Sequence, residues 1–559
     1  MKKRILAVLL VATMAIGLTA CSGSSSGDSE ASNQEGGEEN DDGTITLANG
    51  NVTDADGNII VSNEYHEVEL NGITYHVADD ITTEEITIQY MTFDDEATVT
   101  ALADVFMELY PNITVEIIYE DSGDYETTLQ SLIAAGKAPD VMMYTDADYA
   151  LNNMMLEDIT YLYESDDETD ELDSTFAEAG MGSFSTSHWF SVPVKFFPGI
   201  MFIDQNVLET FNIETPDTDW TWSEMIDLIK ACTGTINGEK YFGLGYLNRL
   251  DSYYGIASSQ DIVGEFGFDG YDFDLSAWAI GEQEFSDLIA NRYVAPQANT
   301  DGAEEYFGDY TKWFGETGRV AVIAESYWTF QYRWNTETYL ENFDLDIIPM
   351  SVPAVSEEDA SADHHTIATI DMGGLVYGTE YPREAWELLK FMSFGRDGWL
   401  TRCYIYSAMD DEGNYVYTDD SGVALKNGLM CAPSTTNEEV WDAYIEMYCY
   451  GMDDEHRALW ENYFDTCKQP ISYGWETIAG YYTFCVEYFN AQVEGTTTGI
   501  HNIIDASLKQ ASDYVDEGTR QANLYHADAM MTYFGPDGYD VLSDEEYESY
   551  QELYDANSN

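Results

Sequence analysis

The hydrophobic and polar positions from residue 86 onward alternate between a strand-like and a helix-like repeat. Residues 86–91, 113–119 and 140–144 read as three apolar strands, separated by one amphipathic helix that ends before Pro111 and another over 123–135. Strands that alternate with helices through short connections are typical of a parallel, doubly wound sheet, which this pattern therefore predicts.

Polar and aromatic residues directly follow the predicted strands. Ligands of doubly wound sheets bind outside the carboxyl ends of the strands. The sequence therefore makes Phe93, Asp121 and Asp146 candidate ligand contacts. Both aspartates also have an alternative role, since carboxylates at such positions cap the helices that follow.

The segment 188–204 interrupts the alternation and is the centre of the predicted fold. It reads as two short apolar strands punctuated by Pro193 and Pro198, because proline marks strand ends and bends. Its one lysine is Lys195. We interpret the segment as the first crossing between two lobes, with Trp189 and Lys195 close to the ligand. The alternative for the aromatic residues of this segment is an ordinary role in the core.

The rest of the chain is richer in helices. Helices are predicted over 204–212, 221–233, 281–292 and 303–315. Strands are predicted over 318–326 and 344–349, and the first of these ends in the polar pair Glu325-Ser326. Two short strands flank Gly373-Gly374, and an amphipathic helix begins at Pro382. Most of 430–555 is helical, with a hairpin-like insert over 410–422 and a small β extension over 44–85 before the main fold.

The N-terminus carries a targeting signal. Three basic residues precede an apolar run over 5–18, which is too short to span a membrane as a mature helix and is expected to be cleaved. The sequence Leu-Thr-Ala-Cys that ends at Cys21 resembles the lipobox of bacterial lipoproteins. That resemblance implies that Cys21 is diacylated and becomes the mature N-terminus; the alternative is an ordinary signal peptide with an incidental cysteine. Residues 22–43 are rich in Ser, Gly and Glu and predict a flexible tether.

Charge narrows the classes of partner. The formal net charge is −84, from 21 basic and 105 acidic residues, so phosphate repulsion excludes nucleic acid as a partner. The same charge disfavours anionic ligands as a class, and it also serves solubility. Six cysteines follow Cys21, but none forms a Cys-x2-Cys pair, so neither a metal site nor a disulfide pairing is predicted.

Four segments occur in an order that resembles a known family. These segments are 136–160, 198–233, 318–328 and 372–392, and their order behind a lipobox is similar to that of the extracellular solute-binding proteins of family 1, the sugar-type receptors of ABC importers. The resemblance implies a two-lobed α/β periplasmic-binding-protein-like fold of type II, with the ligand cleft between the lobes and a helical C-terminal region. It also implies crossings near 190–196 and 366–372, and a third beyond residue 400.

The resemblance assigns expected roles and boundaries. Trp328 maps to an aromatic residue that stacks on the ligand, and Trp189 to the aromatic residue of the crossing. Gly373 and Gly374 map to a turn whose backbone approaches the ligand. The last expected contact is Glu325, in the polar pair that ends the strand over 318–326. The expected organisation is a signal peptide over 1–20, Cys21 and linker over 21–43, the β extension over 44–85, a first lobe from 86–190 with 366–405, and a second lobe from 191–365 with 406–559.

The chemistry of the sequence is compatible with three functions. A sugar site needs flat aromatic rings and fixed hydrogen-bond partners for hydroxyl groups. The expected function is therefore a lipid-anchored, extracellular and monomeric receptor, without cofactor or metal, that captures an oligosaccharide by lobe closure and delivers it to an ABC permease. The acidity also suits a polyamine or another cation. A surface-anchored glycoside hydrolase is the third alternative, because 105 acidic residues supply chance carboxylate pairs.

Overall fold

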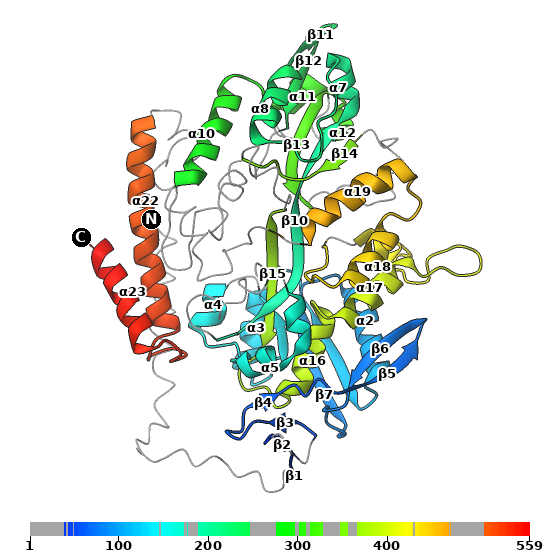
Figure 1. Cartoon of the computed structure of the whole chain (residues 1–559), viewed down its shortest axis with the longest axis vertical. Helices are drawn as coiled ribbons and strands as arrows, with labels where there is room; N and C mark the ends of the chain where they lie inside the picture. Colours follow the sequence, from blue (N-terminus) through cyan, green and yellow to red (C-terminus); the bar gives the residue numbers. More distant parts are fainter. Residues whose placement is uncertain are drawn as a thin grey trace.

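The computed structural model describes most of the chain. The described residues are 38–40, 43–47, 50–144, 147–172, 176, 188–245, 276–296, 301–308, 314–327, 347–355, 366–428, 431–468, 470 and 508–558. A mixed sheet runs along the long axis of the molecule, with helices on its sides (Figure 1).

The first part of the main sheet has the predicted strand–helix alternation. Its elements are β7 (Ile86–Thr92), α2 (Glu96–Leu109), β8 (Ile113–Tyr119), α3 (Tyr125–Ala134) and β9 (Val141–Met143). β7 pairs in parallel with both β8 and β9, as in a doubly wound sheet. The strand and helix predictions for this segment are confirmed.

One long strand joins this part of the sheet to the rest. β10 (Val192–Asp204) pairs through its first half with β15 (Ala368–Leu375) and through its second half with β13 (Val320–Ser326) and β14 (Ile347–Met350). The full strand order is β11-β12-β13-β10-β15-β9-β7-β8, with β14 on β10. Figure 1 shows β10 as the longest strand, extending between the two ends of the molecule.

The prediction of two short strands in this segment is wrong. Both prolines lie inside one continuous strand. Pro193 lies at an irregularity in the pairing with β15, and Pro198 is the last residue paired with β15 before Gly199 pairs with β13. The strand tolerates proline because each one lies where the regular ladder is interrupted.

The remaining strands and helices at that end cover the second half of β10. These elements are β11 (Gly234–Ile236), β12 (Glu239–Leu244), α7 (Gln205–Phe211), α8 (Trp222–Ala231), α10 (Ser276–Ala290), α11 (Asp301–Phe307) and α12 (Phe314–Thr317). The predicted helices over 204–212 and 221–233 are confirmed. The helix expected over 281–292 begins earlier, and the one expected over 303–315 is described as two separate helices.

Helices of the C-terminal half pack on both sides of the sheet. They are α16 (Pro382–Met392), α17 (Arg396–Ser407), α18 (Glu438–Tyr448), α19 (Asp454–Cys467), α22 (Leu508–Tyr533) and α23 (Asp544–Asn557). α16 and α17 contact α2, whereas α22 contacts α23, α10 and α4 (Ala147–Asn152). A third chain segment lies along β10 near residue 432, because the Ala432 amide donates to the Phe196 carbonyl over 2.9 Å.

Short strands before β7 form two small antiparallel sheets. β1 (Glu38–Glu39), β2 (Ile45–Thr46), β3 (Val52–Thr53) and β4 (Ile59–Ile60) make the first, and β5 (Tyr65–Leu70) with β6 (Ile73–Ala78) makes the second. The segment is tied to the main fold at α16, where Asn51 and the Thr82 amide both donate to the Glu384 carboxylate.

A buried charge network holds α16 in place. The Arg383 guanidinium donates to both carboxylate oxygens of Asp80, over 2.8 and 2.7 Å, and to Glu387 over 2.8 Å. The Lys390 ammonium lies 3.0 Å from the Asp166 carboxylate. Paired in this way, charges on a fully buried helix avoid the large desolvation cost of isolated ions.

The five cysteines that the structure describes are buried free thiols. Within the described ranges, no helix is both long and apolar enough to cross a membrane.

Candidate functional site

Lys195 and Asp94 form an ion pair at the crossing. Lys195 belongs to the first half of β10, and Asp94 follows the carboxyl end of β7; Lys195 Nζ lies 2.9 Å from Asp94 Oδ1. Asp95 serves as the N-cap of α2 instead, accepting from the Thr98 amide over 2.8 Å. Asp94 is therefore available for a partner outside its own helix.

Two further charged residues face this pair. Asp371 of β15 lies opposite Lys195 in the strand register. Arg402 of α17 places Nη1 3.8 Å from Asp94 Oδ2, and its guanidinium lies 5.3 Å from the ring centroid of Trp399. The site thus combines two carboxylates and two cations, contributed by β7, β10, β15 and α17.

One aromatic ring completes the group. Lys195 Nζ lies 5.4 Å from the centroid of Phe93, and the edge of that half-buried ring meets Tyr125 at 5.3 Å. We call Phe93, Asp94, Lys195, Asp371 and Arg402 the crossing cluster. Its members come from distant parts of the sequence, and β10 brings them together.

The pKa values in the crossing cluster shift in opposite directions. Burial raises the pKa of Asp94, but Lys195 and Arg402 outweigh burial and the net pKa lies below its usual value. Burial lowers the pKa of Lys195, but Asp94 and Asp371 reverse the direction. Burial raises the pKa of Asp371 to about 6, and Asp94 adds to this shift while Lys195 opposes it. The cluster therefore carries little excess negative charge, unlike the chain as a whole.

Two other predicted contact residues have partners outside the cluster. Trp189 is stacked face to face on Tyr163, with centroids 4.0 Å apart and planes at 9°. The exposed Asp121 accepts from the Tyr119 hydroxyl over 3.1 Å, next to its own strand. Trp189 thus has one face covered by protein, and Asp121 is a loop residue with a local partner.

The two glycines are accounted for by close packing of strands. A Cβ atom on Gly373 would lie 2.6 Å from Cγ2 of Val194, and one on Gly374 would lie 2.5 Å from the carbonyl oxygen of Phe190. The close approach at both positions is therefore made by the crossing segment itself.

For the remaining predicted positions, the structure gives the backbone pairing of Glu325 only. Glu325 lies in β13, where its backbone is in register with Ile200 of β10. Asp146, Trp328 and Cys21 lie outside the described residues.

Sequence reasoning missed three members of the cluster. Asp94 stands at a strand-to-helix junction, where the sequence favours a helix cap over an ion pair. Asp371 has a usable signal, because it is the one charged residue within the apolar strand β15. Arg402 has no such signal, since α17 carries two arginines, Arg396 and Arg402, and each resembles an ordinary solvated residue.

The family model of the bacterial extracellular solute-binding proteins matches residues 92–394. This match covers more than half of the chain, and the chain belongs to that family. Membership places it among non-enzymatic solute receptors that work outside the cytoplasm. No curated protein matches the sequence significantly.

Solved structures confirm the fold. An ABC substrate-binding protein from Listeria monocytogenes, in complex with cycloalternan, is 15% identical, with a TM-score of 0.51 over 78% of this chain and 99% of that one. An open sugar transporter protein from Rhizobium etli is 14% identical, with a TM-score of 0.55 over 78% and 99%. The sugar-binding protein MalE from Xanthomonas citri is 14% identical, with a TM-score of 0.52 over 78% and 98%. The predicted periplasmic-binding-protein fold is confirmed by these matches.

Over the described ranges, no group of three histidine, cysteine or carboxylate side chains is placed to hold a metal ion.

Proposed function

We propose that this protein is the carbohydrate receptor of an ABC importer and that the crossing cluster forms the floor of its ligand cleft. The observation that carries the proposal is the position of the cluster. It lies at the carboxyl end of β7, beside the paired strands β10 and β15. Open α/β sheets bind ligands at such places. Three similar solved structures, a complex with cycloalternan, a sugar transporter and a sugar-binding protein, add to its support.

The chemistry of the cluster favours a neutral polar ligand. Asp94 is already paired with Lys195, and Asp371, whose pKa burial raises to about 6, lies opposite the same lysine in the strand register. A polyamine needs unpaired carboxylates, whereas sugar hydroxyl groups both donate to and accept from charged side chains that are fixed by pairing. Phe93 supplies an apolar surface for the C–H face of a sugar ring.

The finer parts of the proposal concern anchoring and delivery. Lipid on Cys21 would hold the receptor at the extracellular face of the membrane, with the linker before β1 as a tether, since Glu38 and Glu39 already pair with β2. Closure of the two lobes on an oligosaccharide, with Trp328 as a stacking platform, would present the loaded form to the permease. Mass spectrometry of the protein from its native membrane tests the anchor, because diacylation adds the mass of a lipid to Cys21.

A thermal-shift series tests the ligand class. The mature chain carrying Cys21→Ser, and so free of lipid, is mixed with maltose, longer oligosaccharides or spermidine. A ligand that binds the folded state raises the melting temperature once its concentration exceeds the dissociation constant. A rise with an oligosaccharide is expected, and a rise with spermidine alone would replace the carbohydrate proposal by the cation one.

A pair of lysine variants tests the location. Lys195→Met should weaken sugar binding at least tenfold, because it removes the partner of Asp94 at the proposed cleft floor. Lys240→Met is the matched control: Lys240 also lies near a phenylalanine ring, 5.1 Å from the centroid of Phe242, but on β12. Equal affinities of the two folded variants would remove the crossing cluster from the site.

A further inference from the structure

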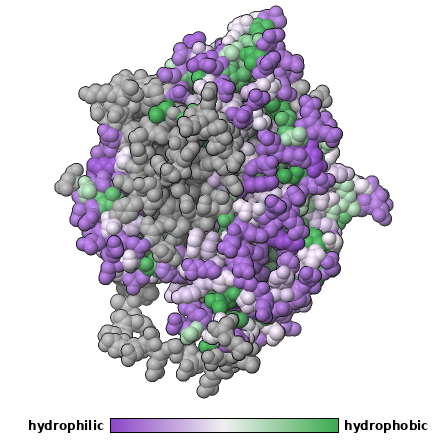
Figure 2. Space-filling view, viewed as in Figure 1, coloured by the Kyte–Doolittle hydropathy of each residue, from purple (hydrophilic) through white to green (hydrophobic). Residues whose placement is uncertain are grey.

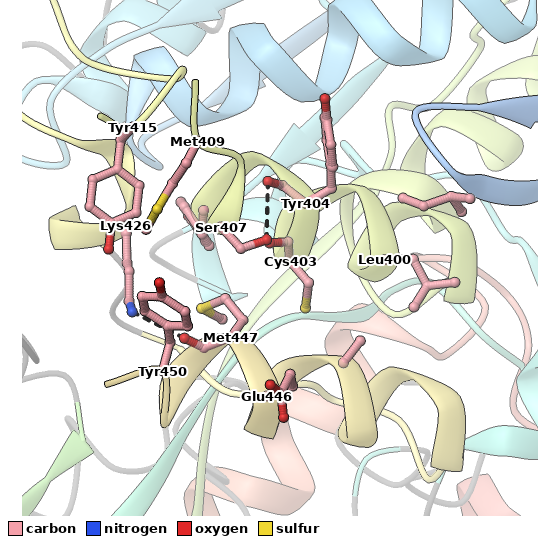
Figure 3. A pocket seen from close by; sticks show the side chains of 13 residues that line it. Leu400, Cys403, Tyr404, Ser407, Met409, Tyr415, Lys426, Glu446, Met447 and Tyr450 are labelled. Carbon is pink, nitrogen blue, oxygen red and sulfur yellow. Dashed lines mark hydrogen bonds between the residues drawn. The ribbon is translucent and has the colours of Figure 1, made fainter. Parts of the chain in front are cut away.

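A cavity lies beside the insert over 410–422. It has a volume of about 440 Å³ and lies between α17, α18 and the chain from Met409 to Lys426. Figure 3 shows side chains from all three segments around it. Its walls are mainly aromatic rings and thioethers, from Tyr404, Tyr406, Tyr415, Tyr450, Met409 and Met447.

The insert builds one wall of this cavity. Its stem is fixed by backbone hydrogen bonds from Val416 to Ala408 over 2.9 Å and from Leu425 to Tyr417 over 3.1 Å. The insert protrudes at the right edge of Figure 2 and carries exposed Val416 and Val423. A defined hydrogen-bonded segment therefore forms one side of the cavity, which is open to solvent.

Two polar side chains in the walls, Ser407 and Lys426, have protein partners. The Ser407 hydroxyl donates to the Cys403 carbonyl over 2.7 Å, within α17. The Lys426 ammonium donates to the Met447 carbonyl over 3.0 Å and lies 5.8 Å from the centroid of Tyr450. A ligand is therefore not required to supply polar groups for them.

Charge limits the ligand class further. Burial raises the pKa of the Cys403 thiol to about 12, so this wall residue is neutral. The Lys426 ammonium disfavours a cation in the cavity, while the net charge of −84 disfavours an anion approaching it. The Glu446 carboxylate binds Arg457 over 2.8 Å and is 70% exposed, so it is directed to solvent.

We infer that this cavity is a second ligand site, which takes a neutral, largely apolar molecule with one or two rings. The volume lies within the range of small-molecule sites, about 300–1,000 Å³, and such sites are mostly apolar. Tyrosine rings and methionine side chains suit ring-shaped apolar ligands through stacking and sulfur–aromatic contacts. Tyr450, 58% exposed, and Met409, 37% exposed, form an apolar rim that such a ligand would cover.

The site adjoins the crossing cluster at Tyr406, a wall residue whose hydroxyl accepts a hydrogen bond from Arg402 Nη1 over 3.5 Å. Both use α17, but Arg402 reaches Asp94 while Cys403 and Ser407 line the cavity. Binding here is therefore a second activity, whose test does not depend on the carbohydrate proposal.

The inference is tested by titration with N-phenyl-1-naphthylamine. This neutral probe joins a phenyl ring to a naphthalene, and its fluorescence rises in apolar surroundings. The mature chain carrying Cys21→Ser should bind it saturably, with one molecule per chain. Ala443→Phe, which places a ring in the cavity from α18, should weaken binding at least tenfold. Asp442→Phe adds the same ring at the neighbouring exposed position of α18 and should leave binding unchanged.

A second variant protects the test against misfolding. Tyr450→Ala removes an exposed wall residue and should weaken probe binding several-fold without changing the melting temperature greatly. Absence of saturable binding, or equal binding by the parent, Ala443→Phe and Tyr450→Ala proteins, would overturn the inference. Oligosaccharide binding measured on the same variants should remain at the parent level, which distinguishes failure of this site from failure of the proposed cleft.

Discussion

Asp371 is the member of the crossing cluster whose ionisation the fold opposes. Burial is the main cause, and Asp94 adds to it. Asp94 shifts the other way because Lys195 and Arg402 offset its burial. A carboxyl whose pKa is higher in the folded than in the unfolded state stabilises the fold while it is protonated. That stability is lost as the pH rises through the folded-state pKa.

The variant Asp371→Asn should show this dependence, because asparagine stays neutral at every pH. Its melting temperature relative to the parent should rise between about pH 4, the unfolded-state pKa, and about pH 6, and should level off above that. Differential scanning calorimetry across this range measures the difference. Asp121→Asn, in an exposed loop, is the control and should give a nearly constant difference. A constant difference for Asp371→Asn would contradict the raised pKa.

At the scale of elements, the close packing of β15 against the chain just before β10 makes Gly374 hard to replace. A methyl group there would meet the Phe190 backbone, which cannot move without shifting the crossing segment. Gly374→Ala should lower the free energy of unfolding by about 1–3 kcal/mol, the usual effect of overpacking. Gly123→Ala is a fair control, because nothing lies within 4 Å of the added atom. Denaturant unfolding compares the two, and equal stabilities would mean that the strands adjust freely.

Helix α16 depends on its buried charges. Arg383→Met leaves Asp80 buried without its cation and Glu387 with Lys390 alone, 3.5 Å away, and should cost about 3–5 kcal/mol of unfolding free energy. Arg457→Met, which removes the surface pairs with Glu446 and Glu461, should cost less than about 1 kcal/mol. Urea unfolding of both variants checks the ranking, and a larger loss in the Arg457 variant would reject it.

These elements also show what the sequence could predict. The strands and helices of 86–143 follow from local periodicity, so they were predicted with nearly correct bounds. The continuity of β10 was missed because the tolerance of Pro198 depends on where its partner strand changes. The sequence singles out Phe93 and Lys195 separately, and their role as ligand contacts stays a prediction; Asp371 and Arg402 join them only through strand register and helix packing across the molecule.

On the scale of the whole molecule, buried cations are concentrated in a chain with few of them. Lys195, Arg383, Lys390 and Arg402 all pair with carboxylates in the interior or at the crossing. Only 21 lysines and arginines balance 105 acidic residues, so the surface is left strongly negative. Hydrophilic side chains dominate the coloured surface in Figure 2. Repulsion among surface carboxylates therefore opposes the compact state.

Salt should consequently stabilise this protein. Raising the ionic strength from about 0.01 M to about 0.1 M shortens the Debye length from about 30 Å to about 10 Å, which screens repulsion between separate surface carboxylates but leaves buried pairs nearly intact. The melting temperature at neutral pH should rise by a few degrees with sodium chloride and equally with choline chloride, because screening does not depend on the cation. A fall would mean that attractive surface pairs, such as those of Arg457, outweigh the repulsion. A rise with sodium alone would indicate a specific cation site in place of general screening.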